Sequence, residues 1–260
     1  KGQGAMSSST GNTVGPIEAL ELVPPEILRL LIAKSKPNKA IEFDTGMGLV
    51  TLADEYERLA ARDFELELAN KDLSRRQRVQ VEDAAGAVRM ASTISGGQAQ
   101  ATAVTFRHLA LLAQTKKSDE DVWHSLKDSG AIETVTEQLQ DRLNRMRHWI
   151  DSPHFPEEMR INILSKPNAA AIQNFDQDEA SILRALTVEL SKCQWNKKDI
   201  SAAIPRSIES LPAAHKSIAY KVAYLCLMGV EKGPRLAPIL SEMEKSDIIS
   251  LLHSCIEILD

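Results

Sequence analysis

The sequence has few aromatic residues, few cysteines and no long apolar run. Aromatic residues make up only 4% of the 260 positions, and the cysteines are Cys193, Cys226 and Cys255. These three are far apart and form no C-x-x-C pair, which argues against a zinc cluster and a disulfide framework and favours a reducing cytoplasm. No apolar run approaches the roughly 20 residues that a membrane-spanning helix needs. We therefore expect a cytoplasmic protein with no membrane partner and no bound metal.

A surplus of basic residues is also absent. The chain has 31 Lys and Arg against 36 Asp and Glu, which gives a formal net charge of −5. This balance excludes a uniformly basic nucleic-acid binder, and we expect no DNA partner. The hydrophobic content of 43% is ordinary for a globular protein, so the chain can form a core.

Apolar residues spaced three and four apart predict helices through most of the chain. The expected helices cover residues 25–33, a segment beginning near 49, a segment after Ser118, 132–150, a segment after Asp176, 216–228 and 248–259. The alternating run over 40–44, followed by Gly46 and Gly48, predicts one short strand. The fold class is therefore mainly α with minor β.

The most unusual segment lies at residues 4–12, where glycines flank four consecutive hydroxyl side chains. Backbone N–H groups and hydroxyls in such a loop can donate hydrogen bonds to an anion. The alternative is a serine-rich chain end without a ligand. The segment has neither the Walker A pattern nor the third glycine of a dinucleotide fingerprint.

Residues 6–12, M-S-S-S-T-G-N, resemble the K-M-S-K-S-type signature loop of class I aminoacyl-tRNA synthetases. The serine variant followed by G-N is similar to class I lysyl-tRNA synthetases of the archaeal type. Three further segments follow in that family's order: P-P-E-I-L-R at 24–29, P-N-K at 37–39 and G-V-E-K-G-P-R-L at 229–236. Residues 60–104 match the family loosely.

The resemblance implies a parent enzyme that attaches lysine to tRNA(Lys) using ATP with Mg²⁺. The signature loop would hold the ATP phosphates through the residues Met6, Ser7, Ser8, Ser9, Gly11 and Asn12. Two positions depart from the pattern, because Ala5 stands where the family has lysine and Thr10 stands where it has lysine or serine. A loop without a cation depends on N–H and O–H dipoles alone to stabilise developing negative charge.

The H-x-G-H-type motif of class I synthetases is missing, since none of the six histidines has a glycine two positions after it. No complete catalytic site is expected in this chain, and no cofactor is expected to bind it. We interpret the chain as a C-terminal fragment that is inactive alone and whose partners are tRNA(Lys) and an N-terminal catalytic domain of the same protein. By the same resemblance, residues 1–104 form the signature loop and a stem-contact-type region. Residues 105–260 form an α-helical anticodon-binding cage, with a subdivision near 175.

A local excess of positive charge supports tRNA binding. Residues 190–245 contain nine Lys and Arg against five Asp and Glu. Cations offset phosphate charge, and unpaired bases stack on flat side chains. The candidate tRNA-binding residues are Trp195, Lys197, Lys198, Arg206, Lys232 and Arg235. Two have structural alternatives, because Trp195 suits a core position at a helix end and Arg235 suits the C-terminus of a helix.

Other polar features have simpler explanations. The pairs Trp123-His124 and His148-Trp149 fit core packing with one polar edge. The acidic residues at 176–179 fit a helix N-terminus better than a metal site. Two other functions remain open: a non-enzymatic helical protein-interaction module, and a fragment of a glutamyl-type class I synthetase. The M-S-S-S-x-G-N loop and the P-N-K segment favour lysine over glutamate.

Overall fold

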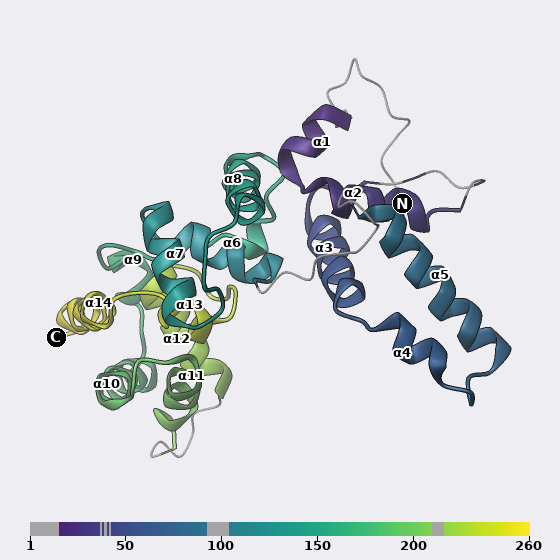
Figure 1. Cartoon of the computed structure of the whole chain (residues 1–260). Coiled ribbons are helices and arrows are strands. Elements are labelled where there is room, and N and C mark those ends of the chain that lie inside the picture. The colour runs from purple at the N-terminus through teal and green to yellow at the C-terminus, as the bar shows by residue number, and fades with distance from the viewer. Residues whose placement is uncertain (1–15, 37, 39–40, 42, 93–103, 210–215) are drawn as a thin grey trace. The chain divides into compact units, whose positions relative to one another are not determined.

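The computed structural model describes residues 16–36, 38, 41, 43–92, 104–209 and 216–260. Within these ranges it contains fourteen α-helices and no strand (Figure 1). The predicted signature loop, residues 6–12, lies outside the described ranges. None of the described helices is both long and apolar enough to cross a membrane.

The chain divides into two compact units. Unit 1 comprises Lys1–Ala113 and Leu126–Pro156, and unit 2 comprises Gln114–Ser125 and Glu157–Asp260. The functional division at residue 104 and the subdivision near 175 stay predictions.

The helices of unit 1 are α1 (Pro16–Leu22), α2 (Pro25–Lys34), α3 (Met47–Ala60), α4 (Phe64–Ala69), α5 (Arg75–Ala91), most of α6 (Phe106–Thr115) and α8 (Glu137–Asp151). Of these, α1, α3 and α5 pack on α2, and α4 packs on α5. Figure 1 shows α5 beside α2, and the Arg29 guanidinium donates to the Met90 carbonyl oxygen at 2.7 Å across this pair. Pro25 is the first residue of α2, as predicted, because that position needs no N–H donor.

The strand expected over 40–44 is absent from the residues described there, Ile41, Phe43 and Asp44. The Asp44 carboxylate instead accepts hydrogen bonds from the N–H groups of Gly46 and Gly48, both at 2.8 Å. A Cβ atom at Gly48 would lie 2.5 Å from the Asp44 side chain. The two glycines therefore let the chain turn around a carboxylate and enter α3, where the alternating pattern had indicated an extended segment.

A buried tryptophan and a buried ion pair stabilise unit 1. Trp149 is fully buried between Phe106 and Phe155, and its indole N–H donates to the Thr45 carbonyl oxygen at 2.8 Å. Arg142 and Glu26 form a buried ion pair of 2.6 Å. The Trp149 contacts agree with the core role that the sequence indicated.

Unit 2 is a helical bundle. Its helices are most of α7 (Asp119–Asp128), α9 (Ala169–Ile172), α10 (Gln177–Lys192), α11 (Lys197–Arg206), α12 (Lys216–Met228), α13 (Leu236–Leu240) and α14 (Lys245–Glu257), with a 3₁₀ turn at Glu157–Met159. The helices α10, α12 and α14 pack on one another through apolar side chains, among them Leu186, Val222 and Leu252 (Figure 1). This arrangement confirms the mainly α prediction.

The helix ends follow the chemistry of their caps. Asp176 and Glu179 form a reciprocal capping box at the start of α10, which agrees with the predicted N-terminus. Gly229 ends α12 with a φ of 71°, a conformation that glycine adopts without strain. The stripe over 132–150 is helical only from Glu137, because the Thr136 hydroxyl accepts the Leu139 N–H and caps the helix there.

Candidate nucleic-acid interface

Lys197 and Lys198 are the first two residues of α11, and both are exposed. The helix begins here because the Asn196 side chain accepts the Asp199 N–H at 2.9 Å. The positive end of the helix dipole adds to the charge of the two ammonium groups. The start of α11 is therefore an electropositive position.

Arg235 directly precedes α13 and is exposed. It occupies the N-cap position of that helix, so it does not lie in the last turn of a helix as the structural alternative would require. The backbone before it rests on Tyr224, whose hydroxyl lies 2.7 Å from the Pro234 carbonyl oxygen and 3.0 Å from that of Gly233. A Cβ at Gly233 would lie 3.2 Å from the Tyr224 ring, so this close approach favours glycine.

These three cations line one cavity of about 630 Å³, which we call the basic cavity. Its lining residues are Lys197, Lys198, Ser201, Tyr220, Tyr224, Arg235, Leu236, Ala237 and Pro238. The lining contains no Asp or Glu, and none of the three cations has an ion-pair partner among the described residues. The cavity thus combines uncompensated positive charge with an apolar and aromatic wall.

The other predicted cations are placed elsewhere. Arg206, at the end of α11, forms an ion pair of 3.3 Å with Glu189. Lys232 lines a separate cavity of about 760 Å³, together with the acidic residues Glu157 and Glu158. The structure therefore brings together three of the six predicted residues.

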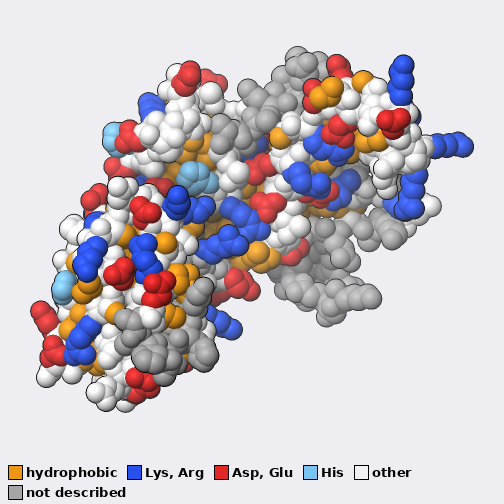
Figure 2. All heavy atoms as spheres, turned by 90° about the horizontal axis from the view of Figure 1, so that it is seen from below, with side chains coloured by type: hydrophobic (Ala, Val, Ile, Leu, Met, Phe, Trp, Pro, Cys, Tyr) orange, Lys and Arg blue, Asp and Glu red, His pale blue; other side chains and the backbone are white. Residues whose placement is uncertain are grey.

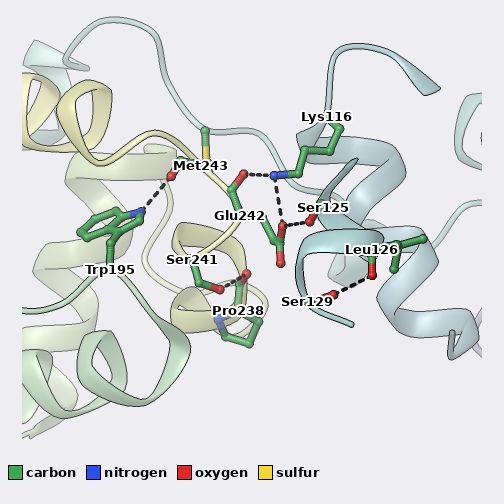
Figure 3. Close-up of polar contacts among 9 residues, drawn as sticks. All are labelled: Lys116, Ser125, Leu126, Ser129, Trp195, Pro238, Ser241, Glu242 and Met243. Atoms are coloured by element: carbon green, nitrogen blue, oxygen red, sulfur yellow. Dashed lines mark hydrogen bonds and ion pairs between the residues drawn. The ribbon is translucent and has the colours of Figure 1, made fainter. Parts of the chain in front are cut away.

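Trp195 is half-buried and packs against the core of unit 2. Its indole N–H donates to the Met243 carbonyl oxygen at 2.8 Å (Figure 3). The Lys245 ammonium lies 5.8 Å from its ring centroid. These contacts are those of an anchoring residue. Stacking of Trp195 on an RNA base stays a prediction.

The segment after α13 is fixed by contacts around Glu242 (Figure 3). The Lys116 ammonium donates to the Glu242 carbonyl oxygen at 2.7 Å and lies 3.1 Å from its carboxylate, which also accepts the Ser125 hydroxyl at 2.8 Å. Because Glu242 follows α13 by two residues, these contacts hold the helix that carries one wall of the basic cavity.

Sequence reasoning missed the two tyrosines of the basic cavity. Tyr220 and Tyr224 lie four residues apart on α12 and therefore share a helix face. Burial, and next the neighbouring Tyr220, raise the pKa of Tyr224, so its hydroxyl stays protonated and can donate to the 233–234 backbone. The available signal was this spacing just before the G-P-R-L segment.

Positive charge is concentrated only locally. On the face in Figure 2, Lys and Arg side chains are interspersed with Asp and Glu side chains. Within the described part of the chain, no group of three or more His, Cys, Asp or Glu residues is arranged to hold a metal ion.

Comparison with known proteins gives two findings. Residues 1–84 match the family described as tRNA synthetases class I (K). Over 98% of its length, the chain is 28% identical to a lysine–tRNA ligase of Thermoplasma acidophilum and 29% identical to one of Thermoplasma volcanium. It is 27% identical over 97% of its length to a lysine–tRNA ligase of Pyrococcus horikoshii.

The chain spans about half the length of these curated relatives, 47% in each case. The similarity includes the regions before and after residue 104, and so extends beyond the family match. Both comparisons confirm that this chain resembles class I lysyl-tRNA synthetases of the archaeal type.

Proposed function

We propose that this chain is the tRNA-binding C-terminal part of an enzyme that attaches lysine to tRNA(Lys) using ATP. The observation that carries the binding role is the convergence of Lys197, Lys198 and Arg235 on one cavity without an acidic residue. The relatives named lysine–tRNA ligase support the choice of RNA over other polyanions.

The basic cavity suits a single-stranded part of the tRNA, the anticodon region. Its cations offset phosphate charge, and its aromatic and apolar wall suits bases that are not paired within a helix. Each phosphate contact releases counterions, so binding should weaken steeply with salt, with a slope of about −0.7 per contact for a single strand.

Lysine activation is a separate step in this proposal. The residues that would hold ATP, Met6 to Asn12, lie outside the described part of the chain, and the sequence has no H-x-G-H motif. We expect no lysine-dependent exchange of pyrophosphate into ATP by this chain alone. Detectable exchange would contradict the assignment of activation to another part of the enzyme.

A charge-reversal experiment tests the binding role. The variant K197E/K198E/R235E should weaken binding of tRNA(Lys) on the order of 100-fold at low salt, because three exposed charge contacts of about 1 kcal/mol each add to about 3 kcal/mol. The control K166E/R184E/K192E makes the same change in net charge at exposed positions of unit 2 that do not line the cavity. We expect this control to change the dissociation constant less than about threefold.

Three outcomes would count against the proposal. Equal losses in the two triple variants would show that only net charge matters. Absence of binding by the unaltered chain at low salt would remove the RNA-binding role. Tighter binding of tRNA(Glu) than of tRNA(Lys) would favour the glutamyl-type alternative.

A further inference from the structure

We propose that Tyr220 is the surface on which the basic cavity stacks an unpaired nucleobase. This inference rests on the proposed RNA-binding function and assigns a residue that determines preference for single-stranded RNA. The sequence had indicated Trp195 for such a role, and the structure offers Tyr220 as a second aromatic ring, placed among the unpaired cations.

The position of Tyr220 carries the argument. Its half-buried ring lines the same cavity as Lys197, Lys198 and Arg235. Within the described part of the chain, no residue forms a hydrogen bond with its hydroxyl. Trp195 differs in both respects, because it does not line this cavity and its N–H group donates to the Met243 carbonyl oxygen.

The surroundings of Tyr220 are held in place by contacts that do not involve it. Tyr224, one turn further along α12, fixes the backbone of residues 233 and 234 through its hydroxyl. Lys116 and Ser125 hold Glu242 just after α13. The wall formed by Leu236, Ala237 and Pro238 is therefore pre-organised, which lowers the cost of ordering the site when RNA binds.

The chemistry of the cavity favours a base together with its phosphates. Its volume of about 630 Å³ is within the usual range for small-ligand pockets. An aromatic ring stacks on any base, whereas lysine and arginine contact the flanking phosphates. A paired base is already stacked within its helix, so the site should discriminate by strandedness more than by base identity.

Substitutions at Tyr220 separate stacking from charge. Tyr220→Leu keeps an apolar side chain but removes the ring, and it should weaken binding of tRNA(Lys) and of a seven-nucleotide anticodon-loop RNA by about 5- to 150-fold. Tyr220→Phe keeps the ring and should stay within about twofold of the unaltered chain. Binding of a twelve-base-pair RNA duplex should be the same for all three proteins.

The salt dependence gives a second readout. Because Tyr220 contacts no phosphate in this proposal, Tyr220→Leu should lower affinity without changing the slope of log K against log salt. K197E/K198E/R235E should reduce that slope. Circular dichroism and thermal melting of each variant serve as the control that it is folded.

A crosslinking experiment on the unaltered chain covers the case in which Tyr220→Leu does not fold. Anticodon-loop RNA carrying 4-thiouridine, irradiated in the complex, should crosslink to the peptide that contains Tyr220. Crosslinking only to peptides outside α11, α12 and the 229–238 segment would overturn the inference.

The possible failures are distinguishable. If Tyr220→Leu binds like the unaltered chain while the charge-reversal variant loses binding, the stacking role is wrong and the RNA-binding function stands. An equal loss of single-stranded and duplex binding by Tyr220→Leu also overturns the stacking role. If the unaltered chain binds no RNA, the proposed function fails and the stacking role fails with it.

Discussion

The two units of the molecule use charged side chains in opposite ways. Unit 1 buries an ion pair, in which Arg142 and Glu26 lie 2.6 Å apart with side chains only 5% and 6% exposed. In the described part of unit 2 the buried polar residues are Thr187 and Ser207. The Thr187 hydroxyl donates to the Leu183 carbonyl oxygen and the Ser207 hydroxyl to that of Ile204. The cations of its basic cavity are exposed instead.

This difference shows which charges are available to a ligand. Arg142 in unit 1 is committed to Glu26, and its Nε atom has no hydrogen-bond partner among the described residues. Removal of such ions from water is costly, and their mutual attraction repays that cost only when the pair stays intact. Lys197, Lys198 and Arg235 are exposed to solvent, so a polyanion can contact them without a large desolvation cost.

The largest expected effect breaks the buried pair of unit 1. Arg142→Met leaves the Glu26 carboxylate buried without its partner and should lower the free energy of unfolding by about 3–5 kcal/mol. The matched control is Arg107→Met, because Arg107 forms an exposed pair of 2.8 Å with Asp54. That control should cost less than about 1 kcal/mol.

Chemical denaturation followed by circular dichroism measures both values. The double variant Glu26→Gln with Arg142→Met should recover part of the loss, since no charge is then left buried. Equal costs for Arg142→Met and Arg107→Met would show that burial of the pair is unimportant.

The second prediction compares the loss of stability on replacing each of the two aromatic residues considered for RNA binding in unit 2. Trp195→Ala removes a half-buried ring and the hydrogen bond to Met243, and it should destabilise the chain by about 2–3 kcal/mol. Tyr220→Leu should cost about 1 kcal/mol or less, because its hydroxyl has no partner among the described residues. Thermal melting of the two variants tests this order, and the reverse order would contradict the anchoring role of Trp195.

A pair of glycines extends the comparison to the backbone. Gly229 of unit 2 has a φ of 71°, so Gly229→Ala should cost about 1–2 kcal/mol. Gly86 of unit 1 lies inside α5, and a Cβ there would meet nothing within 4 Å. Gly86→Ala should therefore stabilise the chain by about 0.5–1 kcal/mol. Melting temperatures that move in the same direction for the two variants would contradict this assignment.

The smallest effect concerns the pH dependence of unit 1. Burial raises the pKa of Glu57, against the opposing influence of the Phe106 N–H, which donates to its carboxylate at 2.7 Å. The folded state therefore binds the Glu57 proton more tightly than the unfolded state, whose glutamate pKa is about 4.3. This contribution to stability is present below that pH and is lost as pH rises through the folded pKa.

Glu57→Gln retains an oxygen that accepts the Phe106 N–H but does not titrate. Denaturation midpoints measured from pH 3.5 to 7 should show a smaller loss of stability on raising the pH for this variant than for the unaltered chain. An unchanged difference between the two pH limits would assign the dependence to other groups.

The sequence predicted most helices because their signals are local. Pro25 at the start of α2, the Asp176 cap of α10 and Gly229 after α12 each act within one helical turn. The strand expected over 40–44 was wrong, because an alternating pattern does not show where a carboxylate will find its hydrogen-bond donors. The Asp44 carboxylate accepts hydrogen bonds from the N–H groups of Gly46 and Gly48, and the chain turns there.

By itself, the sequence determined the resemblance to class I lysyl-tRNA synthetases and the local excess of positive charge near the C-terminus, since both depend on residue identity and order. Only the tertiary structure decided which cations act together. Arg235 lies 37 positions after Lys198 in the sequence, and their meeting in one cavity depends on the packing of α11, α12 and α13. The same packing placed the ring of Tyr220 on the cavity wall, whereas Trp195 lies outside that lining and donates to the Met243 carbonyl oxygen.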